Sequence, residues 1–168
     1  MSNKNNFFSI EGEINNHLKE KVLNFLKPFL KQKNQEIIFK INSEGGNLES
    51  LRRIKTYMYF LAKKCGHSFT CKLIYAESAA FLLFLNCNVR EVSDDGKGSV
   101  GIIHLPVPNR DCDPKKLERE RSDQASFIFR RSGYKVPFKE VFKLEGKKMK
   151  SDELISFGFA TKKVKSFT

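Results

Sequence analysis

The sequence has no long apolar run and no secretory leader. Its longest uninterrupted apolar stretch, from Ala79 to Leu85, is seven residues, whereas a transmembrane helix needs about 18 or more. The start, MSNKNNFFSIEGE, carries one lysine and a very short apolar patch, and no small-residue cleavage site follows it. We therefore expect no membrane span and no secretion, and a cytoplasmic protein is the default prediction.

The sequence also lacks the paired ligand spacings of a structural zinc site. The stretch CGHSFTC brings Cys65, His67 and Cys71 close together, but no second pair of ligands accompanies it. We therefore predict no metal site. In a cytosolic chain the four cysteines, which include Cys87 and Cys112, are expected to be free thiols in or near the core.

Acidic residues are too few to balance the basic ones, and the formal net charge is +12. Residues 115–168 hold 15 Lys and Arg against 7 Asp and Glu, so 15 − 7 = +8 of this charge lies in the C-terminal third. Clusters such as GKKMK and TKKVK can attract an acidic partner. However, the chain has neither helix-turn-helix nor zinc-finger spacing, and no exposed aromatics interleave with the lysines. A solvated basic surface is the favoured interpretation, and nucleic-acid binding is not predicted.

No linker, repeat or low-complexity block divides the chain, so residues 1–168 are expected to form a single domain. Short apolar or alternating segments alternate with segments of 3.6-residue period over the first hundred residues. This order predicts a largely parallel sheet covered by helices. Expected strands cover 7–12, 36–42, 68–75, 88–93 and 99–104. Expected helices cover 15–33 with a break at Pro28, 47–64, the run after Ser78, 113–131, a segment from Pro137, and a short last helix that Ser151 caps and Gly158 closes.

Ser78 stands where an expected strand gives way to the apolar helix of IYAESAAFLLFLN. A serine at this place is most often a helix cap, but it is also where a nucleophile would be exposed. A nucleophilic serine needs a base, and the chain has three histidines. His17 lies on the polar side of a helix and His67 in a loop, whereas His104 ends the strand SVGIIH. Because the ends of parallel strands share one edge of a sheet, Ser78 and His104 are expected to meet there.

The same edge offers donors for a developing oxyanion. A helix that begins after Ser78 leaves the N–H of Ala79 without an intrahelical partner, at the positive end of the helix dipole. The turn SEGGN follows a neighbouring strand, and Gly45 and Gly46 there allow the backbone to approach a substrate carbonyl. Each of these features also has a simpler structural explanation as a cap, a buried histidine or a turn.

Three segments resemble, in order, the signature regions of the Clp protease proteolytic subunit family: IFKINSEGGNLESLRRI, YAESAAFLLF and GSVGIIHLPV. The segment SDELISFGFAT resembles that family's last helix and its tyrosine–glycine ending. The resemblance covers roughly residues 7–165. It implies an α/β fold, a ClpP/crotonase-like superhelix of repeated β-β-α units, with a helical handle over Asp113–Arg131 in the C-terminal third.

The resemblance also implies an activity. It implies a serine peptidase that cleaves peptides or unfolded protein, with Ser78 as nucleophile and His104 as general base. The N–H groups of Ala79 and of the Gly45–Gly46 pair would form the oxyanion hole. No cofactor is implied, and family members self-assemble into stacked rings, so a homo-oligomer is expected.

Three departures from the family pattern leave other interpretations of the function open. The residue before the serine is Glu77, a carboxylate that would disfavour an oxyanion unless it points to solvent. The position expected for the triad aspartate holds Phe142, with Glu140 and Glu145 nearby as substitutes. The chain starts at the first strand without the family's N-terminal segment and has a short handle, which leaves open the coupling to an ATP-driven unfoldase and the usual ring geometry.

Two rival interpretations follow from these departures. The first is a degenerate, non-catalytic subunit that serves as a scaffold or ring component, which Phe142 and Glu77 favour and the retained Ser78 and His104 oppose. The second is a crotonase-type acyl-CoA enzyme, which would leave Ser78 and His104 without a shared purpose.

Overall fold

The computed structural model describes residues 6–107 and 113–167. Its strands are β1 (Phe7–Glu11), β2 (Glu36–Ser43), β3 (Ser68–Glu77), β4 (Val89–Ser93), β5 (Val100–Ile102), β6 (Lys148–Lys150) and β7 (Lys162–Val164). Its helices are α1 (Asn16–Leu26), the 3-10 helix η2 (Lys27–Lys31), α2 (Leu48–Cys65), α3 (Ala79–Asn86), α4 (Pro114–Arg131), α5 (Phe138–Lys143) and α6 (Ser151–Ser156).

The sheet is parallel along the order β1-β2-β3-β4-β7. Strand β3 changes partner along its length: Thr70–Leu73 pair with β4, and Tyr75–Glu77 pair with β5, again in parallel. Strand β6 then pairs with β5 in the antiparallel sense. The expected α/β fold with a largely parallel sheet is therefore confirmed. On the side of β3 that faces β4, the last three residues of β3 pair with β5 instead.

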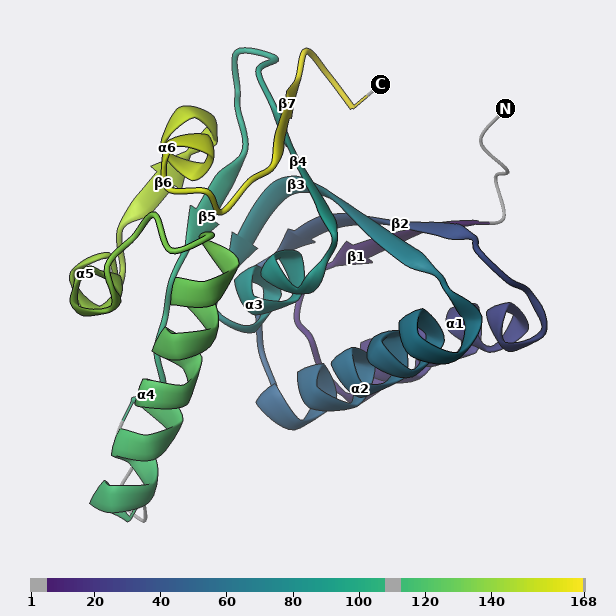
Figure 1. Ribbon diagram of the computed structural model, residues 1–168, viewed down its shortest axis with the longest axis horizontal. Helices are drawn as coiled ribbons and strands as arrows, with labels where there is room; N and C mark the ends of the chain where they lie inside the picture. Colours follow the sequence, from purple (N-terminus) through teal and green to yellow (C-terminus); the bar gives the residue numbers. More distant parts are fainter. Residues whose placement is uncertain (1–5, 108–112, 168) are drawn as a thin grey trace.

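The helices cover the sheet with the apolar faces that their periodicity predicts. Helices α1 and α2 lie beside one another under β1–β3, and α3 lies on the same side of the sheet, between α2 and α4 (Figure 1). Asn15 and Asn47 cap α1 and α2 by accepting hydrogen bonds from backbone N–H groups three residues on. Every residue of α3 from Ala79 to Leu85 is buried, which explains its uninterrupted apolar sequence.

Local sequence signals account for most ends of the helices. The cap of the last helix and the two short strands β6 and β7 are the exceptions. Helix α1 stops at Leu26 and the chain continues as η2, as expected from Pro28, which has no N–H to continue the helix. Ser151 was expected to cap the last helix, and this was wrong. Residue Lys150 occupies the cap position, while the buried hydroxyl of Ser151 donates to Ser93 O (2.6 Å) and accepts from Ser99 N (2.8 Å). The strands β6 and β7 were not predicted.

The cysteines also depart from expectation, since Cys71 and Cys87 form a disulfide between β3 and the residue after α3. The expectation of free thiols was wrong for this pair because the turn of the chain through α3 brings their Cα atoms to 5.9 Å. Cys65 is free and buried, and Cys112 lies outside the described residues. His67, the third member of the CGHSFTC cluster, is buried, with Nδ1 accepting from Gln35 N–H and Nε2 beside Phe29 O.

Helix α4 extends away from the sheet, with its N-terminal end farthest from it (Figure 1). Only Ala125 and Ile128 on this helix are buried, near its other end. The helix covers the range expected of the handle and packs against α5 and α3. Among the helices of the described residues, none combines the length and apolar character needed to cross a membrane.

Candidate active site

Ser78 occupies a strained turn between β3 and α3. Its backbone has φ 53° and ψ −121°, a left-handed φ that costs a non-glycine residue about 1–3 kcal/mol. The residue stands at the cap position of α3, yet its side chain makes no capping hydrogen bond. Its N–H donates instead to Ile102 O of β5 at 3.2 Å. A strained serine between strand and helix is the geometry that exposes the nucleophile in α/β-hydrolases.

Gly45 lies directly against this turn. A Cβ on Gly45 would lie 2.5 Å from Glu77 O, 2.9 Å from Ser78 Cβ and 3.0 Å from Ala79 N. The N–H of Gly45 donates to Ser43 Oγ at 3.1 Å. The neighbouring Gly46 has φ 139°, and a Cβ there would meet Ile14 O instead. The absence of a side chain at Gly45 is therefore what allows the ends of β2 and β3 to approach each other.

One cavity collects the residues that the sequence singled out. Ser78, His104 and Gly46 line it together, and Leu48, Gln124 and Glu145 complete much of its wall. The side chain of His104 is 43% exposed, so the cavity opens to solvent at the histidine. Ala79 is fully buried as the first residue of α3. The structure thus brings the expected serine and histidine to one site.

A carboxylate reaches the histidine from an unexpected place. His104 Nδ1 lies 3.2 Å from Glu77 Oε1. The other oxygen of Glu77 accepts a hydrogen bond from the hydroxyl of Tyr75. That hydrogen bond, with smaller contributions from burial, raises the pKa of Tyr75 to about 12, so this phenol remains a neutral donor at physiological pH. Tyr75, Glu77 and His104 form one connected polar chain beside Ser78.

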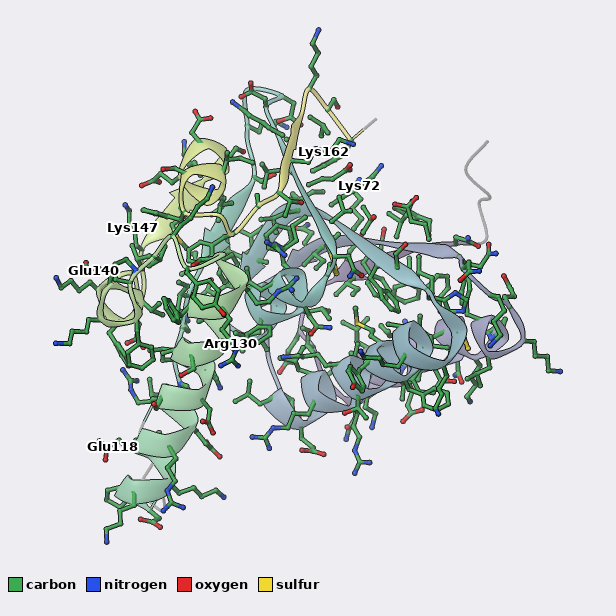
Figure 2. The ribbon with its side chains drawn as sticks, in the orientation of Figure 1. Lys72, Glu118, Arg130, Glu140, Lys147 and Lys162 are labelled. Carbon is green, nitrogen blue, oxygen red and sulfur yellow. A yellow bond between two sulfur atoms is a disulfide. The ribbon has the colours of Figure 1, made fainter. Side chains whose placement is uncertain are left out.

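The carboxylates considered from the sequence are placed differently. Glu145 lines the cavity, but its oxygens bind Leu105 N–H (3.2 Å) and Arg121 Nη2 (2.9 Å). Glu140, labelled in Figure 2, pairs with Lys143 at 2.6 Å on the exposed side of α5. Phe142 packs edge-on against the ring of another phenylalanine of α5, 5.4 Å between centroids. Neither Glu140 nor Phe142 lines the cavity.

Glu77 is the residue whose position the sequence analysis missed, because we treated it as an obstacle beside the serine. Two signals point to its position. Side chains alternate along a strand, so Tyr75 and Glu77 share a face of β3. Glu77 pairs with Ile102 in parallel register, and His104 follows two residues later, which returns it to the same face. The partner strand and its register were not available from the sequence pattern alone.

No group of three or more His, Cys, Asp or Glu side chains in the described part of the chain is arranged to hold a metal ion. The polar side chains that line the cavity are those of Ser78, His104, Gln124 and Glu145. A serine, a histidine and nearby backbone N–H groups are a donor and acceptor set suited to acyl transfer.

The strand order and the helices that cover the sheet define the fold class: the chain has a ClpP-like fold. It is similar to the structure of a ClpP1 point mutant from Listeria monocytogenes, with a TM-score of 0.80 and 20% sequence identity. The match covers 97% of this chain and 93% of that one. No protein-family model matches the sequence, and no curated protein matches it.

Proposed function

We propose that the protein is a serine peptidase that cleaves peptides through an acyl-enzyme on Ser78, with His104 as general base. The observation that carries this proposal is the strained, uncapped Ser78 in the cavity that also contains His104 and Gly46. A backbone strain of about 1–3 kcal/mol at a serine that caps nothing has no evident structural purpose, and such strain gathers at functional sites.

In the proposed reaction Ser78 Oγ attacks the carbonyl carbon of the scissile peptide bond and gives its proton to Nε2 of His104. The tetrahedral intermediate collapses, the C–N bond breaks, and the leaving amine takes that proton from His104. Water then attacks the acyl ester, with His104 accepting a proton from it. The carboxylic acid product leaves, and Ser78 Oγ recovers its proton. The balance requires only peptide and water, so no cofactor enters.

The proposed oxyanion hole uses two of the three residues in the expected set as donors. The N–H of Ala79 is the first of α3 and has no intrahelical acceptor. Gly46 lines the cavity, whereas the N–H of Gly45 is occupied by Ser43 Oγ. We therefore assign the donor role to Gly46 and Ala79. Gly45 contributes by having no side chain, which leaves room for the Ser78 turn.

Labelling with a fluorophosphonate serine probe tests this function. Wild-type protein is expected to form a covalent adduct on Ser78, located by mass spectrometry of the labelled peptide. Ser78→Ala should abolish labelling, and His104→Ala should slow it by on the order of 10³–10⁴. Hydrolysis of a fluorogenic peptide library should be lost in the same variants. Absence of any adduct on folded wild-type protein would overturn the proposal.

A non-catalytic subunit is the second candidate. The arrangement that favours it is Glu145, which lies in the cavity but is bound by Arg121 and Leu105 N–H rather than by His104. On this alternative, the cavity retains the fold of an active site without its reactivity. Failure of wild-type protein to label, together with a normal thermal unfolding transition, would favour this candidate.

We also propose that the chain self-associates, as its resemblance to ring-forming proteins implies. Helix α4 and its neighbour α5 carry an apolar groove that includes Leu117, Phe138 and Phe142. A groove of this kind on a projecting helix is suited to contact with another copy. Sedimentation velocity at micromolar protein should show a species larger than the 19.4 kDa monomer. A single monomeric boundary across concentrations would contradict self-association and would leave the labelling test unaffected.

A further inference from the structure

We propose that Glu77, the residue directly before the nucleophile, is the carboxylate that positions His104. Its catalytic consequence rests on the serine peptidase function proposed above, whereas its effect on the histidine does not. Glu77 acts through His104 and is therefore a positioning residue. In this site it takes the part that a carboxylate distant in sequence plays in a conventional Ser-His-Asp triad.

The first argument is the contact itself. Glu77 Oε1 lies 3.2 Å from Nδ1 of His104, the ring nitrogen to which a triad acid must bind. The side chain of Glu77 is 23% exposed, so the carboxylate is largely shielded from water. Among residues 6–107 and 113–167, no other carboxylate forms an ion pair with His104. The contact leaves Nε2, the outer nitrogen, for the serine.

The second argument is how the carboxylate is held. Tyr75 donates its hydroxyl to Glu77 Oε2, so both oxygens of Glu77 have a partner. The raised pKa of Tyr75 keeps that hydroxyl protonated. A carboxylate that is held by a hydrogen bond at one oxygen presents its other oxygen in a fixed direction. Supporting hydrogen bonds of this kind orient the residues that act directly in a site.

The third argument is the commitment of the other charged groups around the site. Glu145 is bound by Arg121 from α4 and by Leu105 N–H. Glu44 follows β2 and is close enough to Tyr75 to contribute to its raised pKa. Of the carboxylates around the site in the described part of the chain, Glu77 is the one in contact with His104.

The chemical consequence is control of the histidine tautomer. A hydrogen bond from Nδ1–H to Glu77 would leave the lone pair of the neutral ring on Nε2, which is the nitrogen that must take the serine proton. When Nε2 has taken that proton, Glu77 stabilises the imidazolium that forms. The feature that seemed to disfavour catalysis in the sequence thus supplies the missing third member of the triad.

Rates of fluorophosphonate labelling test the catalytic part. Glu77→Gln should lower the labelling rate by about 10²–10⁴, because the amide no longer fixes the productive tautomer. Glu77→Asp should recover part of that loss, and Tyr75→Phe should cost less than Glu77→Gln. Glu140→Gln is the matched control, since that carboxylate pairs with Lys143 on the surface, and it should label at the wild-type rate.

Combination with His104→Ala separates positioning from a general effect on the site. If Glu77 acts through the histidine, Glu77→Gln should cause no further loss in the His104→Ala background. A further loss of tenfold or more there would overturn the proposal, as would labelling of Glu77→Gln within about threefold of wild type. Circular dichroism and thermal unfolding verify that each variant is folded.

Nitrogen-15 NMR of the histidine rings supplies a readout that needs no activity. The signals of the His104 ring are assigned by their loss in His104→Ala. In wild-type protein, at a pH where this ring is neutral, its proton should be on Nδ1. In Glu77→Gln the signals should move toward a mixture of tautomers. An unchanged ring signature would overturn the proposal even if wild-type protein labels. A changed signature in a protein that never labels would uphold the positioning contact and reject the peptidase function.

Discussion

Gly45 and Ser78 are packed so closely that a Cβ on residue 45 would lie 2.9 Å from the Cβ of Ser78. The two residues follow the neighbouring strands β2 and β3. Both have positive φ, 95° at Gly45 and 53° at Ser78. The strained serine turn therefore exists only because the facing strand end has no side chain there.

Gly45→Ala is predicted to displace the Ser78 turn. The new methyl would clash with backbone atoms at 2.5 Å and 3.0 Å, which cannot move as a flexible side chain would, and alanine is strained at φ 95°. We expect a loss of about 1–3 kcal/mol in the free energy of unfolding and more than tenfold slower labelling of Ser78. Urea denaturation and probe labelling measure the two effects.

Gly96→Ala is the control for the conformational part of that change. Gly96 also has a positive φ, 83°, but an added Cβ there would meet nothing within 4 Å. The Gly96→Ala variant should lose stability through backbone strain alone, and its Ser78 should be labelled at the wild-type rate. Equal labelling in both variants would contradict the packing argument.

The buried ammonium group of Lys55 is predicted to lower the free energy of unfolding at neutral pH. Burial, with a smaller contribution from Arg131, lowers its pKa from 10.5 to about 8. The folded state thus disfavours the protonated amine, and the cost is fully present below pH 8 and disappears as pH rises to 10.5. The shift corresponds to on the order of 3 kcal/mol. The ring of Phe127, 4.0 Å from Nζ, offsets part of it.

Lys55→Met should therefore raise the free energy of unfolding at pH 7, and this gain over wild type should shrink between pH 8 and pH 10.5. Denaturant titrations at pH 7, 9 and 10.5 check the trend. Lys64→Met, on the exposed face of the same helix, should show neither the gain nor its pH dependence. A gain that is constant with pH would mean that packing, rather than charge burial, is responsible.

The course of the chain was predictable where one signal dominates locally. Pro28 ends α1 because it lacks an N–H, and Asn47 starts α2 with its side-chain oxygen. The strands β6 and β7, KMK and KKV, have three residues each and are rich in lysine. Their strand character comes from pairing with β5 and β4, which lie far away in sequence. Local pattern carries no record of such partners.

That Ser78 and His104 line one cavity was predictable because parallel strands end at one edge of the sheet. The role of Glu77 was not, because the direction of its side chain depends on the register between β3 and β5. A slip of one residue would turn it to the other face. The sequence thus predicted that Ser78 and His104 lie at one place, whereas the contact between Glu77 and His104 required the three-dimensional arrangement.

Arg131 is predicted to anchor the far end of the helix that Ser78 begins. Its guanidinium donates to the carbonyl oxygens of Leu85 and Cys87, where α3 ends, and its burial lowers its pKa. Arg131→Met would leave Leu85 O without that donor, at about 1–3 kcal/mol for a buried acceptor, whereas Cys87 O keeps a hydrogen bond from Arg90 Nη1 at 3.2 Å. We expect a loss of roughly 2–3 kcal/mol in the free energy of unfolding, measured by urea denaturation. Arg130→Met, at the exposed neighbouring position labelled in Figure 2, should change it by less than about 0.5 kcal/mol. Equal losses in the two variants would show that the anchor contributes nothing specific.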